Sequence, residues 1–508
     1  MTTHNVADLV RQAAGRAPDK VAFRHLDRSY TWSEVDAQVD RAAAGLVALG
    51  LDPGDRVGLV LGNTVTFPVC YFGALRAGLV AVPVNSSYTV PELTHVLGDS
   101  GARAVVVHSG AAGAVQAVAA ALPALQHVIV AGTPTGGSAT SVDQLLASGG
   151  PAVTSTRAGE DLAVLIYTSG TSGRPKGAML SHRALLANLD QCGRIEPPVM
   201  DADDVMLLVL PLFHIYGLNA GLGMVAKHAA TGVLVEQFDP VDTLAVMRRH
   251  SVTNVMGAPP MYVAWSMLPD VGDAFAAVRL AVSGAAPLPA DVLGRFLDAS
   301  GHHVFEGYGL TETSPVLTST LMSEAAKPAS IGRPIPGVEL QLRDADGAEV
   351  AEDDPGEIVV RGANLFSGYW PDGRDGPDAD GWFRTGDVAY ADEDGDLHLV
   401  DRTRELVLVS GFNVYPREVE TALNQHPGIA EAAVIGISHP YTGESVKAFV
   451  VAREGAVLTA EEVVEFCAQR LARFKCPTAV EFVAELPHSV TGKLAKGRLR
   501  EAAATGTD

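Results

Sequence analysis

Short apolar stretches alternate with amphipathic stretches along the first part of the chain. Residues 31–50, TWSEVDAQVDRAAAGLVALG, repeat apolar side chains at the helical period, begin with a capping box of Thr31 and Glu34, and end at Gly50. The apolar run DRVGLVLG at residues 55–62 follows and has the length of a strand. Helices and strands alternating at this spacing predict an α/β fold built on a wound sheet.

The alternation continues and then changes character. Helices are predicted at residues 66–78 and 91–101, and apolar strands at residues 81–85, 102–108, 162–167, 205–211, 232–238, 253–260 and 278–287. After about residue 330, strands separated by turn residues predict a mainly β subdomain, with strands at 336–344 and 356–362. Past Asp401, helices at 417–427 and 459–474 with strands between them predict a compact α+β lid.

Composition narrows the class of protein. A chain of 508 residues with 47% apolar side chains is too long for one core, so several domains or subdomains are expected. Its 37 basic and 59 acidic side chains give a net charge of −22, which disfavours nucleic acid and anionic lipid as partners. The four cysteines form no pair or metal-like cluster, and neither a secretory signal nor a membrane-spanning run is visible. We therefore expect a cytoplasmic protein with no integral membrane segment.

The stretch YTSGTSGRPKG, from Tyr167 to Gly177, is rich in glycines and hydroxyl side chains. Glycines let the backbone turn its N–H groups towards a ligand, and Lys176 adds a compact positive charge, so the stretch suits a polyphosphate. It differs from the phosphate loop G-x-x-x-x-G-K-[ST], because Gly177 follows the lysine where that motif has a hydroxyl. A flexible linker is the plainer alternative, but linkers seldom combine Thr, Lys and Pro. The stretch follows the strand at 162–167, which is where α/β folds hold ligands.

Four further stretches carry candidate chemistry, and each alone also fits a plain structural role. In EGYGLTETSP, Tyr308 between two glycines can lie against a flat ligand, and Glu312 offers a hard oxygen to magnesium. WFRTGD places Asp387 on a tight turn, where it can accept ribose hydroxyls or simply close the turn. His214 in PLFHIYG equally fits a core residue. Lys493, in SVTGK, is either solvated or a mobile point charge.

Together these stretches define a resemblance. YTSGTSGRPKG, PLFHIYG, EGYGLTETSP, WFRTGD, DRTRELVLVSGFNVYPREVE and SVTGK occur in this order, and the chain closely resembles the adenylate-forming acyl-CoA synthetases over essentially its whole length. The resemblance implies the adenylate-forming enzyme fold. A large N-terminal domain of wound α/β subdomains plus a β subdomain, residues 1–400, would hold ATP and the acid. A small mobile α+β domain, residues 401–508, would turn about a hinge at Asp401 between two half-reactions.

The resemblance also implies ligand-binding roles. The loop around the β- and γ-phosphates of ATP would consist of Thr168, Ser169, Gly170, Thr171, Gly173 and Lys176. Tyr308 would stack on adenine, in a slot shaped by Gly284, Ala285, Ala286 and Gly307. Asp387 and Arg402 would hold the ribose, Thr311 the α-phosphate and Glu312 the magnesium ion. In the second half-reaction, the pantetheine arm of coenzyme A would meet Ser410, Gly411 and Phe412.

Lys493 is the central catalytic residue that the resemblance implies. The carboxylate of the acid must attack an α-phosphate that is already anionic, and Lys493 would bridge the two groups and stabilise the transition state. Thr311, Glu312 and His214 complete the predicted catalytic set. Two positions depart from the family pattern: Arg404 stands where lysine is usual, and Glu306 stands where glutamine is frequent. Both side chains are polar and can form similar hydrogen bonds to the usual ones. We therefore expect them to change the exact position of neighbouring groups and not the type of reaction.

The acid pocket implied by the resemblance is lined by small, apolar or aromatic residues. They are His214, Tyr216, Met261, Tyr262, Gly309 and Pro315. No arginine occurs in APPMYVAW to pair with a second carboxylate, so a dicarboxylate such as malonate is disfavoured. We expect a medium- or long-chain fatty acid. An aromatic acid of the coumarate or benzoate kind is the alternative, because Tyr216 could stack on a ring.

Two other functions share much of this pattern. An acyl-AMP ligase that loads a carrier protein would keep every ATP-binding residue and differ only in the nucleophile. A catalytically silent binding protein is disfavoured, because Lys176, Glu312, Asp387 and Lys493 are all present. The expected ligands are ATP, Mg²⁺, coenzyme A and a small carboxylic acid, with no nucleic-acid partner. The family also allows a homodimer, which no residue of the sequence supports.

Overall fold

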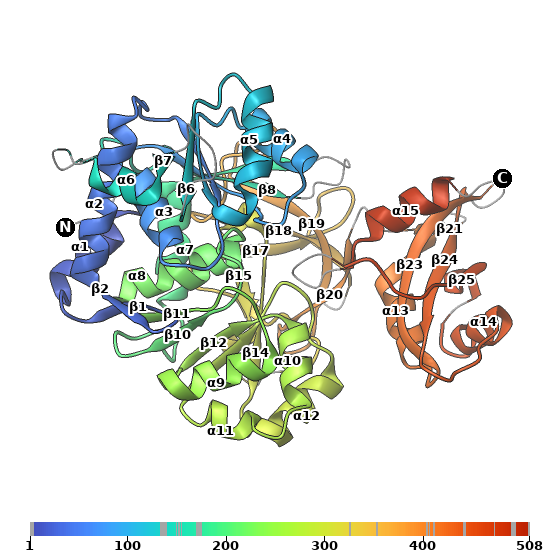
Figure 1. Cartoon of the computed structure of the whole chain (residues 1–508). Coiled ribbons are helices and arrows are strands. Elements are labelled where there is room, and N and C mark those ends of the chain that lie inside the picture. The colour runs from blue at the N-terminus through green and yellow to red at the C-terminus, as the bar shows by residue number, and fades with distance from the viewer. Residues whose placement is uncertain are drawn as a thin grey trace. The chain divides into compact units, whose positions relative to one another are not determined.

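The computed structural model describes most of the chain, namely residues 5–132, 140–148, 150, 153, 155–168, 175–324, 327–351, 354–402, 405, 407–409, 412–439, 443–471, 473–488 and 494–505. The chain forms two compact units (Figure 1). The large unit extends to residue 328 and includes 332–339 and 361–383. The small unit includes 329–331, 340–360 and the chain from residue 384 onward.

The first sheet of the large unit has seven strands and is parallel except at one edge. Its order is β7 (Thr140–Ser141), β6 (His127–Ala131), β5 (Ala104–His108), β3 (Arg56–Val60), β4 (Val80–Pro83), β8 (Leu162–Thr168) and β9 (Lys176–Ser181). Only the last pair, β8 with β9, is antiparallel. Strands such as β5, AVVVH, are almost wholly buried, which explains why they are apolar at consecutive positions.

The second sheet of the large unit has nine strands. Its order is β16 (Arg333–Pro334), β15 (Val316–Ser319), β14 (Val304–Gly309), β13 (Leu280–Ser283), β12 (Asn254–Gly257), β10 (Val205–Leu208), β11 (Thr231–Leu234), β1 (Val21–His25) and β2 (Arg28–Thr31). The strands from β14 to β1 are parallel, so the segments that follow them meet at one edge of the sheet. The predicted adenine and acid motifs follow β10, β12, β13 and β14, and therefore lie at this edge.

Helices connect and cover the strands of both sheets. In the large unit they are α1 (Asp8–Arg16), α2 (Trp32–Ala48), α3 (Thr66–Arg76), α4 (Val90–Asp99), α5 (Ala112–Ala121), α6 (Val142–Ala147), α7 (His182–Cys192), α8 (Met224–His228), α9 (Pro240–His250), α10 (Pro259–Ser266), α11 (Val271–Phe275) and α12 (Ala290–Ser300). The predicted capping box at the start of α2 is confirmed, since Thr31 and Glu34 each bind the other's backbone N–H. These elements confirm the predicted wound α/β architecture.

The small unit contains most of a four-stranded sheet and all of a five-stranded one. The first has the order β17 (Val338–Arg343), β18 (Gly356–Gly362), β19 (Trp382–Ala391) and β20 (Leu397–Arg402). The second has the order β22 (Phe412–Val414), β21 (Val407–Val409), β24 (Gly443–Ala452) and β23 (Ile429–His439), and β25 (Ala479–Phe482) pairs with β24. The helices are α13 (Pro416–Asn424), α14 (Ala460–Ala468) and α15 (Lys496–Thr505).

One predicted helix is shorter in the structure. The helix predicted through Phe474 begins with the expected capping box of Thr459 and Glu462, but α14 ends at Ala468. The guanidinium of Arg470 donates to the carbonyl of Phe466 and lies 3.5 Å from the centroid of its ring, so it caps the last turn from outside.

The compact units differ from the predicted domains over residues 329–331, 340–360 and 384–400, which are grouped with the C-terminal segment. The backbone of Asp401 lies within β20, opposite Val388 of β19. The predicted hinge at Asp401 concerns a motion, and the predicted domain boundary at residue 401 depends on that hinge. Both stay predictions. No helix within the described ranges combines the length and hydropathy needed to cross a bilayer.

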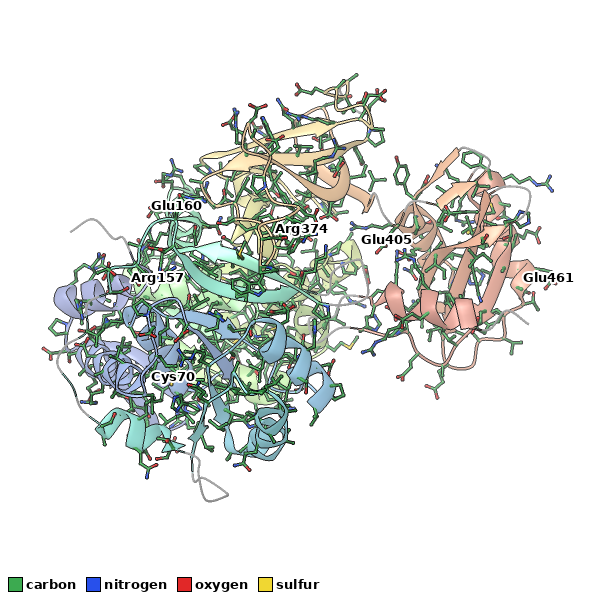
Figure 2. The ribbon with its side chains drawn as sticks, turned by 90° about the horizontal axis from the view of Figure 1, so that it is seen from above. Cys70, Arg157, Glu160, Arg374, Glu405 and Glu461 are labelled. Carbon is green, nitrogen blue, oxygen red and sulfur yellow. The ribbon has the colours of Figure 1, made fainter. Side chains whose placement is uncertain are left out.

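The cysteines all lie inside the units. Cys70, labelled in Figure 2, is on α3, Cys192 ends α7, and Cys467 and Cys476 belong to the core of the small unit. Each of the four side chains is buried. Burial raises the pKa of the Cys70, Cys192 and Cys467 thiols to about 12, so they stay protonated at neutral pH.

Candidate active site

The two described ends of the predicted phosphate loop meet at the end of β8. Thr168 is the last residue of β8, Lys176 is the first of β9, and the two lie directly opposite each other in the antiparallel ladder. Ser169, Gly170, Thr171 and Gly173 lie outside the described residues, and their role stays a prediction. The loop therefore leaves and returns at one point of the sheet edge, as a ligand-binding loop in an α/β fold does.

Lys176 has two partners from the segment that follows Phe366. Its ammonium lies 3.2 Å from the carboxylate of Asp375 and 5.2 Å from the centroid of the Tyr369 ring. The side chains of Lys176 and Asp375 are 40% and 67% exposed, so water screens this ion pair. A triphosphate with several negative charges could therefore take Lys176 from Asp375 at little cost.

The predicted adenine slot is built by two neighbouring strand ends. Ser283 at the end of β13 lies opposite Glu306 in β14, so Gly284, which follows β13, lies beside Gly307 of β14. Ala285 has a left-handed backbone with φ +71°, and Ala286 follows it. The Glu306 carboxylate accepts a hydrogen bond from the N–H of Leu288 at 3.0 Å, which fixes the loop. A glutamine carbonyl could accept the same bond, which explains why glutamate is tolerated here.

A tight turn follows β14 and carries the predicted magnesium ligand. The turn consists of a 3₁₀ helix, Thr311–Thr313, and then Ser314, which is fully buried and has a left-handed backbone with φ +68°. The carbonyl of Pro315 accepts hydrogen bonds from the N–H of Leu310 at 3.1 Å and from the hydroxyl of Thr313 at 2.6 Å. The turn thus closes on itself and sets the positions of Thr311 and Glu312.

Three buried asparagine side chains hold this turn from outside. Asn364 donates to the carbonyl of Thr313 at 2.8 Å, and Asn219 donates to the carbonyl of Ser314 at 2.7 Å. Asn188 donates to the carbonyl of Val316 at 2.8 Å and accepts from its N–H at 3.1 Å. The sequence analysis missed all three. Their only sequence signal is an amide among apolar neighbours, which does not reveal a partner more than fifty residues away.

Glu312 suits a divalent cation that is held mainly by substrate. Its side chain is 9% exposed, and one carboxylate oxygen accepts a hydrogen bond from the Tyr369 hydroxyl at 2.5 Å. The second oxygen has no hydrogen-bond partner among the described residues. Nowhere in the described ranges do three or more His, Cys, Asp or Glu side chains gather around a common point. One carboxylate together with phosphate oxygens is a usual arrangement for magnesium, so the residues present fit this ion.

The predicted acid pocket begins where the backbone after β10 enters a π-helix, Tyr216–Gly223. Such turns are common at functional sites. The ring of Tyr216 lies against Gly284, because a Cβ on this glycine would be 2.9 Å from it. His214 accepts a hydrogen bond from the N–H of Tyr216 at 3.3 Å through Nδ1. The structure thus brings His214 and Tyr216 to the loop that carries the predicted adenine slot.

Tyr262 and Met261 are more deeply buried than expected for pocket walls. Tyr262 is fully buried and donates its hydroxyl to the carbonyl of Val282 at 2.9 Å. Met261 belongs to the same apolar core. Gly309 and Pro315 touch through the backbone, since a Cβ on Gly309 would be 1.8 Å from the Pro315 carbonyl oxygen. Gly309 therefore has a steric role at the turn, and the roles of these four residues in acid binding stay predictions.

The predicted ribose and coenzyme A residues belong to the small unit. Asp387, 6% exposed, lies directly opposite Arg402 across β19 and β20, so their backbones are brought together as expected. Gly386 before it has φ +77°, a conformation that favours glycine. Phe412 opens β22 opposite Val409. Ser410, Gly411, Arg404 and Lys493 lie outside the described residues.

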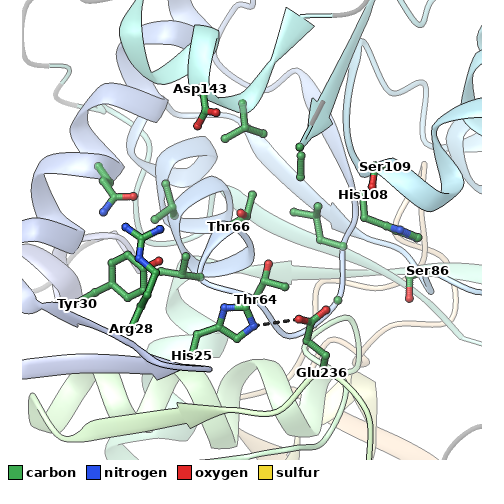
Figure 3. Close-up of a pocket in the computed structure, with 18 of the residues that line it drawn as sticks. His25, Arg28, Tyr30, Thr64, Thr66, Ser86, His108, Ser109, Asp143 and Glu236 are labelled. Carbon is green, nitrogen blue, oxygen red and sulfur yellow. Dashed lines mark hydrogen bonds and ion pairs between the residues drawn. The ribbon is translucent and has the colours of Figure 1, made fainter. Parts of the chain in front are cut away.

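A separate cavity of about 860 Å³ lies in the large unit (Figure 3). It opens where β3, β5 and β6 end, and its lining includes Thr66 at the start of α3 and a hydrogen bond between His25 and Glu236, with 3.0 Å between Nε2 and Oε1. None of the residues predicted to bind ATP or the acid lines it. Its lining combines aliphatic side chains with hydroxyl, imidazole, guanidinium and carboxylate groups, and so is more polar than the lining predicted for the acid pocket.

Comparison with known proteins identifies the family of the chain. The AMP-binding enzyme family model matches residues 10–370, and the model of the AMP-binding enzyme C-terminal domain matches residues 418–493. The fold is that of the adenylate-forming enzymes, and the chain belongs to the AMP-binding enzyme family. The resemblance deduced from the six motifs is thereby confirmed.

Individual relatives cover almost the entire chain. A long-chain-fatty-acid–CoA ligase of Escherichia coli O157:H7 is 35% identical, over 98% of this chain and 94% of its own. A feruloyl-CoA synthase of Amycolatopsis sp. is 37% identical, over 96% of each chain. The crystal structure of ATP-bound MatB from Rhodopseudomonas palustris superimposes with a TM-score of 0.89 at 34% identity, and covers 98% of this chain and 99% of that one.

Proposed function

We propose that the protein is an ATP-dependent acyl-CoA ligase. It activates a carboxylic acid as an acyl-AMP, releases pyrophosphate, and transfers the acyl group to coenzyme A with release of AMP. The observation that carries the proposal is the convergence of two charged groups on one tyrosine. The Lys176 ammonium lies over the ring of Tyr369, and the Glu312 carboxylate binds its hydroxyl. A cation and a carboxylate that contact the same tyrosine suit a triphosphate with its magnesium ion.

The residues divide the adenylation step between them. Lys176 binds the β- and γ-phosphates, Tyr308 lies against adenine, and Asp387 and Arg402 hold the ribose. Glu312 holds a magnesium ion, which supplies neutralisation of charge on the leaving pyrophosphate. Lys493 bridges the carboxylate and the α-phosphate, and its positive charge offsets the repulsion between them. The support for these roles is the family membership and, for Lys176 and Tyr308, a position at or next to a strand end.

The preferred substrate is a medium- or long-chain fatty acid. The support is the apolar character of the predicted pocket and the similarity to a long-chain-fatty-acid–CoA ligase. An aromatic acid is the second candidate, because the Tyr216 ring stands beside Gly284 and a feruloyl-CoA synthase is equally similar. An acyl-AMP ligase that serves a carrier protein differs in the acceptor alone.

The test is coenzyme-A-dependent release of AMP by the purified protein with ATP and magnesium. The acids are saturated fatty acids from short to long, coumarate, benzoate and malonate. Lys493→Ala should lower adenylation by about a hundredfold or more. Lys447→Ala, which removes a lysine that pairs with Glu481, is the matched control and should stay within a few-fold of wild type.

Each outcome selects one function. AMP and thioester from one acid class support the ligase and identify its substrate class. Acyl-AMP without thioester, together with transfer to a phosphopantetheinylated carrier, replaces the ligase by the carrier-loading function. Binding of ATP without turnover of any acid contradicts the enzymatic proposal and supports a silent binding protein.

A further inference from the structure

We propose that Tyr369 is a positioning residue of the adenylation site, with two separable tasks. Its hydroxyl orients the Glu312 carboxylate for a divalent cation, and its ring holds the Lys176 ammonium for the phosphates. The inference rests on the proposed function, because it assigns Glu312 to the metal and Lys176 to the triphosphate. Tyr369 lies in none of the motifs that carry the family resemblance.

The backbone around Tyr369 is fixed by β9, the strand that begins with Lys176. The N–H of Met179 donates to the carbonyl of Gly368 at 3.1 Å, and the N–H of Trp370 donates to the carbonyl of Gly177 at 2.8 Å. The segment 367–370 therefore lies antiparallel beside β9, with a single β-bridge between Ala178 and Tyr369. Its position relative to Lys176 is set by main-chain hydrogen bonds, which do not depend on side-chain rotamers.

The same segment is also bound to the turn that carries Glu312. The N–H of Phe366 donates to the carbonyl of Glu312 at 2.9 Å. The ring of Phe366 meets the ring of Tyr369 edge-on, with 5.1 Å between centroids. Tyr369 is thus held on one side by the phosphate-loop strand and on the other by the metal turn, which is the placement that a bridging side chain needs.

The hydroxyl and the carboxylate make a short hydrogen bond. The distance of 2.5 Å between Oη of Tyr369 and Oε1 of Glu312 is typical of an O–H donor with an ionised acceptor. The bond occupies one oxygen and restricts rotation of the carboxylate, so the orientation of the second oxygen is fixed. Groups that orient a metal ligand in this way commonly change metal affinity 10- to 100-fold when they are removed.

The ring has a different task. The Lys176 ammonium lies 5.2 Å from its centroid, within the range of a cation–π contact. This contact does not involve the hydroxyl, and Tyr369→Phe keeps it. Tyr369→Leu removes both the ring and the hydroxyl. The two variants therefore separate the orientation of Glu312 from the placement of Lys176.

The test measures ATP binding by calorimetry, without acid, over a range of magnesium concentrations and in EDTA. For Tyr369→Phe we expect the magnesium concentration at half-saturation to rise about 10- to 100-fold, with metal-free ATP affinity within twofold of wild type. For Tyr369→Leu we expect the same rise, together with a roughly two- to fivefold loss of metal-free ATP affinity. In turnover, Tyr369→Phe should need more magnesium but regain most of kcat at saturation.

A coupling experiment separates orientation of Glu312 from a general structural effect. In a Glu312→Gln background, Tyr369→Phe should change the magnesium dependence no further. An equal loss in both backgrounds, or an unchanged magnesium dependence of Tyr369→Phe, overturns the inference. Failure of the proposed function has a different signature: wild-type protein would then bind magnesium and ATP without adenylating any acid.

Discussion

Gly309→Ala is the substitution whose effect the structure defines most sharply. The backbone of Gly309 is not left-handed, so alanine is compatible with its conformation and only space decides. The added Cβ would lie 1.8 Å from the Pro315 carbonyl oxygen and 2.7 Å from its carbon. Both atoms belong to the main chain and cannot rotate away. The turn between Leu310 and Pro315 must therefore move.

The size of the movement gives the magnitude. To reach even 3.0 Å from the new Cβ, the Pro315 oxygen must retreat by more than an ångström. That displacement breaks the hydrogen bonds which the oxygen accepts from Leu310 and Thr313. Two lost bonds cost about 2 kcal/mol, and overpacking adds about 1–3 kcal/mol. The large unit should lose about 3–5 kcal/mol of stability. A shift of about 1 Å in Glu312 should lower adenylation roughly a hundredfold.

Thermal unfolding and adenylation rates, measured side by side, test this reasoning. Gly307→Ala is the matched control for stability, because a Cβ there meets its nearest atom at 3.7 Å. We expect Gly309→Ala to lower the unfolding midpoint by roughly 5 °C or more, and Gly307→Ala to leave it nearly unchanged. Equal midpoints for the two alanine variants would refute the steric account of the turn.

Two further predictions concern other contacts of the large unit. Asp375→Asn removes the charge of the exposed partner of Lys176, so ATP should bind up to about fivefold more tightly in a direct titration. Weaker binding would contradict the idea that ATP takes the place of Asp375 beside Lys176. Burial lowers the pKa of His182 to about 4 from its ordinary value of 6.5, so the unfolded chain binds a proton first as the pH falls. The stability that neutral His182 contributes is present above pH 6.5 and lost between pH 6.5 and about 4, by about 3 kcal/mol. His182→Asn retains an acceptor for the N–H of Val6. Denaturant unfolding of this variant between pH 6.5 and 4 should show a smaller loss of stability than wild type. An unaltered pH dependence would show that His182 does not cause the loss.

The fold was predictable because it depends on local patterns. The capping box at Thr31 and Glu34, the apolar run of β5 and the position of the phosphate loop after β8 each need only neighbouring residues. The helix predicted through Phe474 was wrong at its end, because the capping contact of Arg470 depends on a rotamer that periodicity does not describe.

The supports of the site were not predictable in the same way. Glu312 and Tyr369 are 57 residues apart, and Asn219 and Ser314 are 95 apart. A tyrosine or an asparagine has many roles, and only folding decides which backbone carbonyl or carboxylate it meets. Motifs therefore gave candidate ligand-binding residues, whereas the groups that hold them in place became visible only in three dimensions.

The burial of the four cysteines has a practical consequence for kinetics. A chromogenic disulfide reagent reacts with accessible thiolates, and protein thiols that are covered and protonated react slowly. Samples withdrawn during the reaction can thus be titrated for the remaining coenzyme A thiol without removing the native enzyme, because the protein adds little background. A parallel sample without coenzyme A would show any slow colour from the protein itself, and that colour would measure the fraction of molecules that have opened.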